Sequence, residues 1–264
     1  MAASPSLDTG SFTTLRVEER GDRLVARLHR PEVRNAIDQV MVDELHAVCA
    51  HLERVPKTLI LTGTPGDPET GTKGIFASGA DIAQLRERRR EDALAGINST
   101  IFDRIAALPM PVIAALDGYA LGGGAELAYA ADFRIGTEAL RMGNPETNLG
   151  IMAAAGATWR LKELVGEPLA KEILLAGKVL RGSECLAAGL VTELVAPESL
   201  MDAVHALADR IGAQDPLAVR ITKSVFRAPR EAHPVIDTLA QGMLFESDAK
   251  FERMQAFLDK TNRK

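Results

Sequence analysis

The sequence predicts an α/β fold built from repeated strand and helix units, followed by a smaller helical region. Two observations support this. Short β-type runs alternate with helical patterns over the first two-thirds of the 264 residues. No convincing strand pattern follows Val195, and prolines separate the helical patterns found there. We therefore expect an α/β core over residues 1–196 and a helical region over residues 197–264.

The first elements are two strands and a helix. The runs FTTLRVEE (12–19) and DRLVARLH (22–29) favour a pair of strands joined by a turn. Asp38 then precedes a helical pattern over residues 39–53 and is expected to cap it. The apolar residues of that pattern share one face: Val42, Leu45, Cys49 and Leu52.

The next elements repeat this order. TLILTG (58–63) is typical of a buried strand, and a helix is expected near residues 91–107. VIAALDG (112–118) follows as a strand, with a helix starting at Gly122–Gly124, and a third round ends in GLVTELV (189–195). Such units place ligand-binding loops at the carboxyl ends of strands. The helical region is expected to contain helices over 198–212, 216–227 and 235–260.

Composition argues against several classes of function. The net charge of -5 gives no basic excess of the kind that nucleic-acid binding requires. The cluster LRERRRED (85–92) has four arginines, but acids offset them, so we interpret it as a solvated helix face. Cys49 and Cys185 lie in apolar helical patterns, which indicates buried thiols in a reducing compartment. We expect no bound metal, because the histidines show no ligand-like pairing.

Targeting and loop signals are weak. The start, MAASPSLDTGSF, lacks a basic region followed by an apolar core, and no apolar stretch reaches the ~20 residues needed to cross a bilayer. We therefore expect a cytoplasmic protein that does not contact the membrane. The loop over residues 62–74 is rich in Gly, Pro and Thr, and we interpret it as a mobile surface excursion.

A buried acid directly after three glycines is the most informative feature. Glu126 stands in the uncharged run GYALGGGAELAYAADF, where an ionised carboxylate is costly to desolvate. The glycines allow close approach to the backbone, and the helix that they start offers unpaired amide hydrogens to a developing negative charge. The alternative is a tight strand-to-helix crossing in which glycine serves packing alone.

Two further loops carry polar groups. Glu146 follows a proline in RMGNPETNLG, and together with Glu126 it would form a pair of carboxyl groups able to divide acid and base roles. In FASGADI (76–82), small residues precede a helix for which Asp81 is a plausible N-terminal charge; an ordinary capped helix is the alternative.

In chain order these stretches resemble the crotonase superfamily, the enoyl-CoA hydratase and isomerase family. The resemblance covers nearly the whole chain. It implies a crotonase-like spiral of repeated β-β-α units with a C-terminal helical trimerisation region. The motifs that carry it are RPEVRNAID, FASGADI, PVIAALDGYALGGGAELAYAADFRI, GNPETNLG, AAGLVTELV and FERMQAFLDK.

The resemblance also implies roles for particular residues. The amides of Ala80 and Gly123 match the pair that forms an oxyanion hole for the thioester carbonyl of an acyl-CoA. Glu126 and Glu146 match the two glutamates of the hydratases: the first holds and activates water, and the second exchanges a proton with the α-carbon. The substrate is then a coenzyme A thioester, and no prosthetic group is needed.

Further residues match positions that hold coenzyme A or a neighbouring subunit. The resemblance implies homotrimers that pair into hexamers through the helical tail. Coenzyme A is expected to contact Arg34, the segment with Ser78, Ala80, Asp81 and Ile82, and, from a neighbouring subunit, Phe257 and Lys260. A core aromatic and a solvated lysine are the alternatives for the last two.

The segment after Glu146 departs from the family pattern. It reads GIMAAAGATWRL (150–161), with extra alanines and with Trp159 where a glutamine is usual. We expect these side chains to reshape the acyl pocket.

Three functions remain open from the sequence. Hydration of a 2-enoyl-CoA is favoured by the presence of both glutamates. A Δ3,Δ2-enoyl-CoA isomerase or another crotonase-type lyase is the enzymatic alternative. A non-catalytic acyl-CoA-binding or RNA-binding relative is the alternative of a different class.

Overall fold

The chain forms two compact units in a computed structural model that describes residues 7–66 and 70–261. The units are Met1–Ala208 and Asp209–Lys264. The expected division lay after residue 196; in the structure the first unit also contains most of a helix whose apolar side chains are buried. Those side chains are Leu200, Val204, Leu207 and Ala208.

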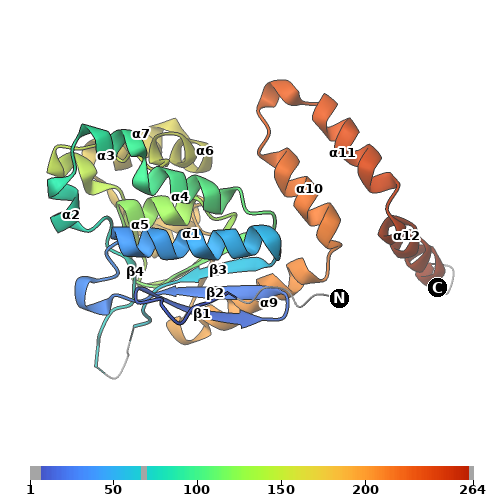
Figure 1. The fold of residues 1–264 in the computed structure, drawn as a ribbon, viewed down its shortest axis with the longest axis horizontal. Coiled ribbons are helices and arrows are strands. Elements are labelled where there is room, and N and C mark those ends of the chain that lie inside the picture. Colours follow the sequence, from blue (N-terminus) through green and yellow to red (C-terminus); the bar gives the residue numbers. More distant parts are fainter. Residues whose placement is uncertain (1–6, 67–69, 262–264) are drawn as a thin grey trace. The chain divides into compact units, whose positions relative to one another are not determined.

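A six-stranded sheet forms the base of the first unit (Figure 1). Its strands, in spatial order, are β1 (Leu15–Arg20), β2 (Arg23–Leu28), β3 (Thr58–Thr62), β5 (Val112–Leu116), β7 (Phe133–Thr137) and β10 (Glu193–Val195). Only the β1–β2 pair is antiparallel. Every residue of β3 and β5 is buried, as expected for central strands covered on both faces.

The chain alternates between this sheet and a second sheet of four strands. Its order is β4 (Ile75–Ala77), β6 (Tyr119–Leu121), β8 (Arg141–Gly143) and β9 (Val179–Arg181). The chain therefore passes from β3 to β4, from β5 to β6 and from β7 to β8, and each pair of strands is followed by helical segments. This is the repeated β-β-α spiral that the resemblance to the crotonase superfamily implies.

The helices of the first unit lie on both sides of these strands. They are α1 (Gln39–Arg54), α2 (Ile82–Glu87), α3 (Arg90–Ala95), α4 (Ile97–Ala106), α5 (Gly123–Tyr129), α6 (Lys162–Val165), α7 (Glu167–Ala176), α8 (Gly182–Ala187) and α9 (Leu200–Gly212). Asp38 caps α1 as predicted, because its Oδ1 accepts a hydrogen bond from the amide of Met41 at 2.8 Å. The predicted apolar face of α1 is buried and packs beside α4 (Figure 1).

Two predicted helices are each divided in the structure. The helix expected near 91–107 is broken at Gly96, whose φ of +64° ends α3 before α4 begins. The helix expected over 235–260 is two helices, α11 (Val235–Phe245) and α12 (Asp248–Thr261). Ser247 lies between them, and its Oγ accepts from the amide of Lys250 at 3.3 Å, so a serine cap marks the break.

The arginine cluster also differs from expectation. Residues 85–92 span the end of α2 and the start of α3, so the cluster is not the face of one helix. In the loop over 62–74, residues 67–69 lie outside the described chain, but both flanking segments are anchored. Thr64 pairs with Ile75, and the amide of Gly66 donates to Oδ2 of Asp117 at 2.9 Å.

The two thiols are buried and unbonded, as predicted. Burial raises the pKa of both Cys49 and Cys185 to about 12, which keeps them protonated and unreactive. Across residues 7–66 and 70–261, no helix is long and apolar enough to span a bilayer. The same residues contain no group of three side chains suited to hold a metal ion.

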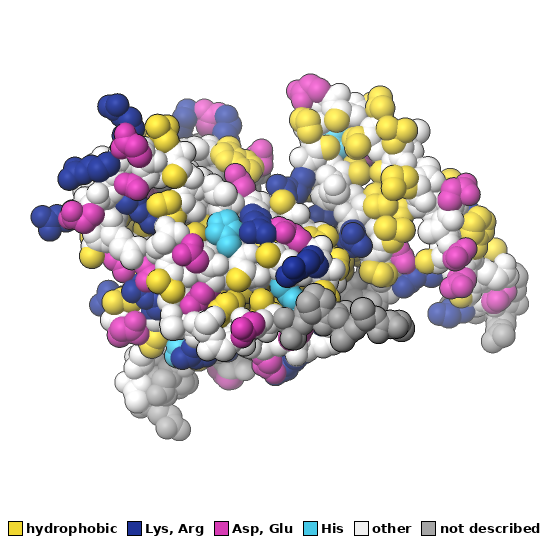
Figure 2. All heavy atoms as spheres, in the orientation of Figure 1, with side chains coloured by type: hydrophobic (Ala, Val, Ile, Leu, Met, Phe, Trp, Pro, Cys, Tyr) yellow, Lys and Arg dark blue, Asp and Glu magenta, His cyan; other side chains and the backbone are white. Residues whose placement is uncertain are grey.

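The second unit consists of helices α10 (Pro216–Phe226), α11 and α12, which expose large apolar side chains. Figure 2 shows apolar side chains gathered over these helices. The most exposed of them include Phe226, Val235, Leu239, Met243 and Phe257.

Candidate active site

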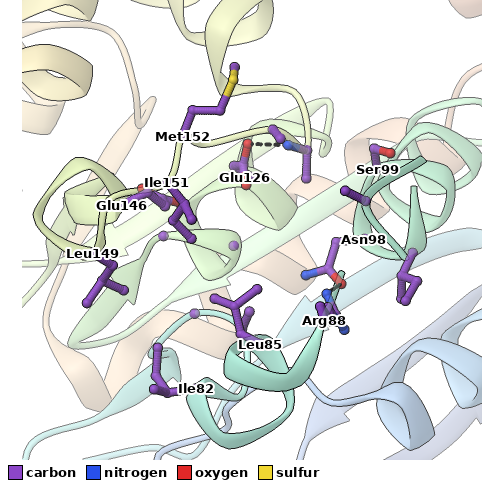
Figure 3. Close-up of a pocket in the computed structure, with 18 of the residues that line it drawn as sticks. Ile82, Leu85, Arg88, Asn98, Ser99, Glu126, Glu146, Leu149, Ile151 and Met152 are labelled. Carbon is purple, nitrogen blue, oxygen red and sulfur yellow. Dashed lines mark hydrogen bonds between the residues drawn. The ribbon is translucent and has the colours of Figure 1, made fainter. Parts of the chain in front are cut away.

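A cavity of about 740 Å³ opens in the first unit where loops from both sheets meet. Its walls come from the loop after β4, the start of α5, the short helix η2 (Pro145–Leu149), the residues that follow η2, and the α2–α4 segment. Figure 3 shows Glu126 and Glu146 among the side chains around it. The structure thus brings together the two acids that the sequence singled out.

Two backbone amides lie next to each other at one wall. Ile37 bonds to both neighbours of Ala80: its amide donates to the carbonyl of Gly79 at 2.8 Å, and its carbonyl accepts from Asp81 at 2.9 Å. In such a bridge the N–H of Ala80 points the opposite way. Gly123 is the first residue of α5, so its amide has no partner within the helix. A Cβ on Gly123 would lie 3.5 Å from the nitrogen of Ala80.

The glycines at this wall have different functions. Gly122 has a φ of +53°, and a Cβ there would lie 3.2 Å from Oε1 of Glu146, so a side chain would intrude on the acid. A Cβ on Gly124 would lie only 2.4 Å from the carbonyl oxygen of Ala77. Packing against β4 therefore explains Gly124, whereas Gly122 and Gly123 keep the cavity open. The packing alternative thus accounts for one glycine of the three.

Glu126 is held by backbone amides from a distant segment. Its side chain is 3% exposed, and its Oε1 accepts from the amides of Ala155 at 2.7 Å and Ala157 at 3.1 Å. Between them, Gly156 turns the chain with a φ of +123°. Burial, with a smaller contribution from the charge of Glu146, raises the pKa of Glu126 to about 7, although the hydrogen bonds from the two amides lower it. The carboxyl group can therefore gain or lose a proton near neutral pH.

Glu146 sits at the start of η2 with its carboxyl group partly unsatisfied. Oε1 accepts a 3.4 Å hydrogen bond from Nδ2 of Asn144, and within the described chain the buried Oε2 has no partner. Burial raises the pKa of Glu146, and the bond from Asn144 opposes that rise. An unpartnered buried oxygen favours the protonated acid, which can then donate its hydrogen to a molecule in the cavity.

Asn144 is in turn fixed by groups behind the cavity wall. Its Oδ1 accepts from the hydroxyl of buried Tyr129 at 3.0 Å, and its Nδ2 also donates to the carbonyl of Gly122 at 3.3 Å. Both side chains are buried, so Asn144 has little freedom to reorient. Sequence reasoning did not identify Tyr129 or Asn144; the available signal was the place of Asn144, two residues before Glu146.

Only some of the residues predicted to bind coenzyme A line the cavity. Ser78, Ala80 and Ile82 line the cavity. Asp81 instead caps α2 and pairs with Arg30 at 3.3 Å. Arg34 has an exposed side chain outside the cavity lining, and its carbonyl accepts from the amide of Ser78 at 3.1 Å.

Phe257 and Lys260 belong to the second unit. Both lie on α12 with exposed side chains.

The prediction that Trp159 reshapes the pocket is wrong. Trp159 lies in the π-helix η3 (Ala157–Leu161), is half exposed, and does not line the cavity. Its ring packs under the guanidinium of Arg160, 4.0 Å from the ring centroid. The neighbouring alanines do reach the site, since Ala154 and Ala155 line the cavity.

Sequence reasoning also missed two polar residues opposite the acids. Arg88 and Asn98 line the cavity, and they are joined by a 3.5 Å contact from Nη1 to Oδ1. The charge balance of the cluster at 85–92 concealed Arg88, because a count of charges does not show which side chain turns inward.

Comparison with known proteins identifies the family of this chain. The sequence profile of the family described as enoyl-CoA hydratase/isomerase matches residues 22–264. The chain belongs to the enoyl-CoA hydratase/isomerase family. It is 34% identical over 254 residues to a short-chain-enoyl-CoA hydratase of Clostridium acetobutylicum, covering 92% of this chain and 94% of that protein. It is 33% identical over 258 residues to a crotonyl-CoA hydratase of Syntrophomonas wolfei, covering 95% and 96%.

Solved structures of enoyl-CoA hydratases have the same fold. The enoyl-CoA hydratase from Bacillus anthracis matches with a TM-score of 0.86 at 28% identity, over 94% of this chain and 97% of that one. One from Geobacillus kaustophilus matches with a TM-score of 0.84 at 34% identity, over 94% and 96%. This family member therefore has the crotonase fold along nearly its whole length.

Proposed function

We propose that the protein is an enoyl-CoA hydratase that adds water to a 2-enoyl-CoA and forms a 3-hydroxyacyl-CoA. The observation that carries the proposal is the presence of Glu126 and Glu146, both with raised pKa values, in one cavity beside the amides of Ala80 and Gly123. The relatives named as hydratases support the same reaction. The substrate is a coenzyme A thioester, and the reaction needs no prosthetic group.

The two amides would bind the thioester oxygen. As water attacks C3, electron density moves onto that oxygen, and two N–H donors stabilise the enolate-like intermediate. The remaining donors of the α5 N-terminus add a favourable electrostatic field. This role requires no side chain, so Ala80 and Gly123 act through their backbone alone.

The carboxyl groups would divide the proton transfers. Glu126, whose ionised form is favoured by two amide donors, takes a proton from water while the hydroxyl oxygen bonds to C3. Protonated Glu146 gives its proton to C2, which completes the addition of one water molecule across the double bond. The proton must then pass from Glu126 back to Glu146, so the active enzyme carries one proton on the pair.

Substitution of each acid tests the proposal. Gln keeps the volume of Glu but cannot exchange a proton at neutral pH. Glu126→Gln and Glu146→Gln should each lower the rate of crotonyl-CoA hydration by about 100-fold or more. The double variant should lose much less than the product of the two single losses, because the acids work as a unit. Near-full hydration by either single variant, with turnover of a 3-enoyl-CoA retained, would instead favour an isomerase.

Coenzyme A and partner subunits complete the proposal. We expect the segment with Ser78 and Ile82, together with Asp81 and Arg34, to contact the coenzyme A portion. Phe257 and Lys260 of a neighbouring copy are expected to contribute as well.

The exposed apolar side chains of α10–α12 support assembly into homotrimers that pair as hexamers, since such a patch on a free subunit is unfavourable in water. Light scattering on the purified protein tests the assembly. We place the enzyme in the cytoplasm.

A further inference from the structure

The cavity wall formed by the α2–α4 segment carries a cation without an acidic partner. Arg88 is half-buried at the end of α2 and lines the cavity. The one hydrogen bond of its guanidinium within the described chain is the 3.5 Å contact from Nη1 to Oδ1 of Asn98, and no carboxylate of that part of the chain pairs with the guanidinium. A partly desolvated guanidinium with only a neutral, long contact is unfavourable unless an anion joins it.

Neighbouring charges do not satisfy Arg88. Asp92 also lines the cavity, but its Oδ2 already accepts the amide of Arg89 at 2.7 Å. Arg86 points outside the cavity lining and lies 3.9 Å from Glu87. Arg89 also lines the cavity, but its side chain is exposed, so Arg88 is the half-buried arginine of the cluster. Its guanidinium is available to a bound molecule.

Asn98 connects this cation to the reacting end of the cavity. A Cβ on Gly123 would lie 3.5 Å from Nδ2 of Asn98 and equally 3.5 Å from the nitrogen of Ala80. The contact with Arg88 occupies Oδ1, which leaves Nδ2 as a donor facing the cavity. Figure 3 shows Asn98 and Arg88 side by side, with Leu85 nearby. An acyl chain whose thioester oxygen meets the two amides would pass Asn98 after a few carbons.

We infer that this cavity selects a short 2-enoyl thioester that carries a carboxylate beyond the double bond. This inference rests on the proposed hydratase function. The carboxylate would pair with Arg88 and accept a hydrogen bond from Asn98. Leu85 and Ile97, which also line the cavity, would contact the carbons between the double bond and the carboxylate.

A pair of substrates that differ only in this group tests the inference. Crotonyl-CoA ends in a methyl group, and 4-carboxybut-2-enoyl-CoA carries a CH₂–COO⁻ group at the same carbon. The intact protein should show a kcat/KM at least 10-fold higher for the carboxylated thioester. Arg88→Met should lower the ratio of the two kcat/KM values by about 10- to 100-fold, the scale of a charge-assisted hydrogen bond. Arg86→Met, the matched control on the exposed side, should leave the ratio unchanged.

The phosphates of coenzyme A are the other anions that Arg88 could meet. In that case Arg88→Met would raise the KM of both thioesters by the same factor and weaken the binding of free coenzyme A. That result, or a wild-type preference for crotonyl-CoA, would overturn the inference.

A binding measurement separates this inference from the hydratase proposal. Calorimetric titration with glutaryl-CoA and butyryl-CoA compares a carboxylated and an uncarboxylated saturated thioester, neither of which can be hydrated. Tighter binding of glutaryl-CoA that is lost in Arg88→Met would support the inference even if neither enoyl thioester were turned over. Equal binding of the two would overturn it.

Discussion

Tyr129 donates its phenolic hydrogen to Oδ1 of Asn144 at 3.0 Å, behind the cavity wall and out of reach of solvent. The bond sets which way the Asn144 amide faces, because an amide whose oxygen is occupied must present its nitrogen to the other side. That nitrogen meets Oε1 of Glu146. Tyr129 and Asn144 are thus positioning residues for the second acid.

Removing this support should change the pH dependence of hydration. The bond from Asn144 lowers the pKa of Glu146 against the effect of burial, so Asn144→Ala should raise that pKa. The alkaline limb of the rate profile, where protonated Glu146 is lost, should move to higher pH. Tyr129→Phe should give a smaller shift in the same direction, and Tyr119→Phe should give none. A shift to lower pH would contradict the assigned contacts.

Glu126 should destabilise the folded protein above neutral pH. The pKa of Glu126 is about 7 in the fold against an ordinary value of 4.5, so below about pH 4.5 both states hold the proton, while above pH 7 folding must bury a charge. This cost is up to about 3 kcal/mol. Urea denaturation of Glu126→Gln should therefore show added stability at pH 8 that disappears toward pH 4.5. Glu163→Gln, at an exposed glutamate, is the control for the substitution itself.

The three-glycine motif can be dissected by single alanines. Gly124→Ala would place a methyl group 2.4 Å from the carbonyl oxygen of Ala77, so it should destabilise the fold by about 3 kcal/mol or more. Gly242→Ala lies in α11 with open space around it and should stabilise by up to about 1 kcal/mol. Thermal unfolding of both variants provides the comparison. Equal melting temperatures would mean that β4 and α5 are not closely packed.

Trp159 should have no effect on substrate choice. Its ring lies outside the cavity, so Trp159→Gln should leave the relative rates on short and long enoyl-CoA thioesters unchanged. Leu85→Ala, which removes a cavity side chain, should shift the preference toward longer chains. Competition assays with mixed thioesters measure both. A change of preference in Trp159→Gln alone would show that η3 moves when substrate binds.

Local patterns were enough to predict the framework of the fold. Strand runs such as β3 and β5, the Asp38 cap and the glycines before α5 each carry a signal that depends on neighbouring residues only. The breaks at Gly96 and Ser247 carried signals too, a glycine and a serine inside helical patterns, but the apolar periodicity on either side masked them.

The sequence could predict only those parts of the site whose chemistry depends on the type of side chain. Glu126 and Glu146 stand out because buried carboxylates are costly, and the resemblance assigned them roles. The amides of Ala155 and Ala157 could not be found, since every residue but proline has an N–H and only the folded path aims it at Glu126. Arg88 was missed and Trp159 was wrongly placed in the pocket for a related reason: side-chain direction near a cavity depends on tertiary packing.

The anchoring of Glu126 by the amides of Ala155 and Ala157 bears on how this enzyme can evolve. The main chain holds the carboxyl group of Glu126, the proposed base, so substitutions among the methyl groups of residues 153–157 can remodel the proposed acyl pocket while Glu126 keeps its hydrogen bonds. Selection for a new substrate is thereby separated from selection for the reaction itself. A randomised library over these positions, with Gly156 held fixed, should yield variants that differ in acyl preference and share one chemistry.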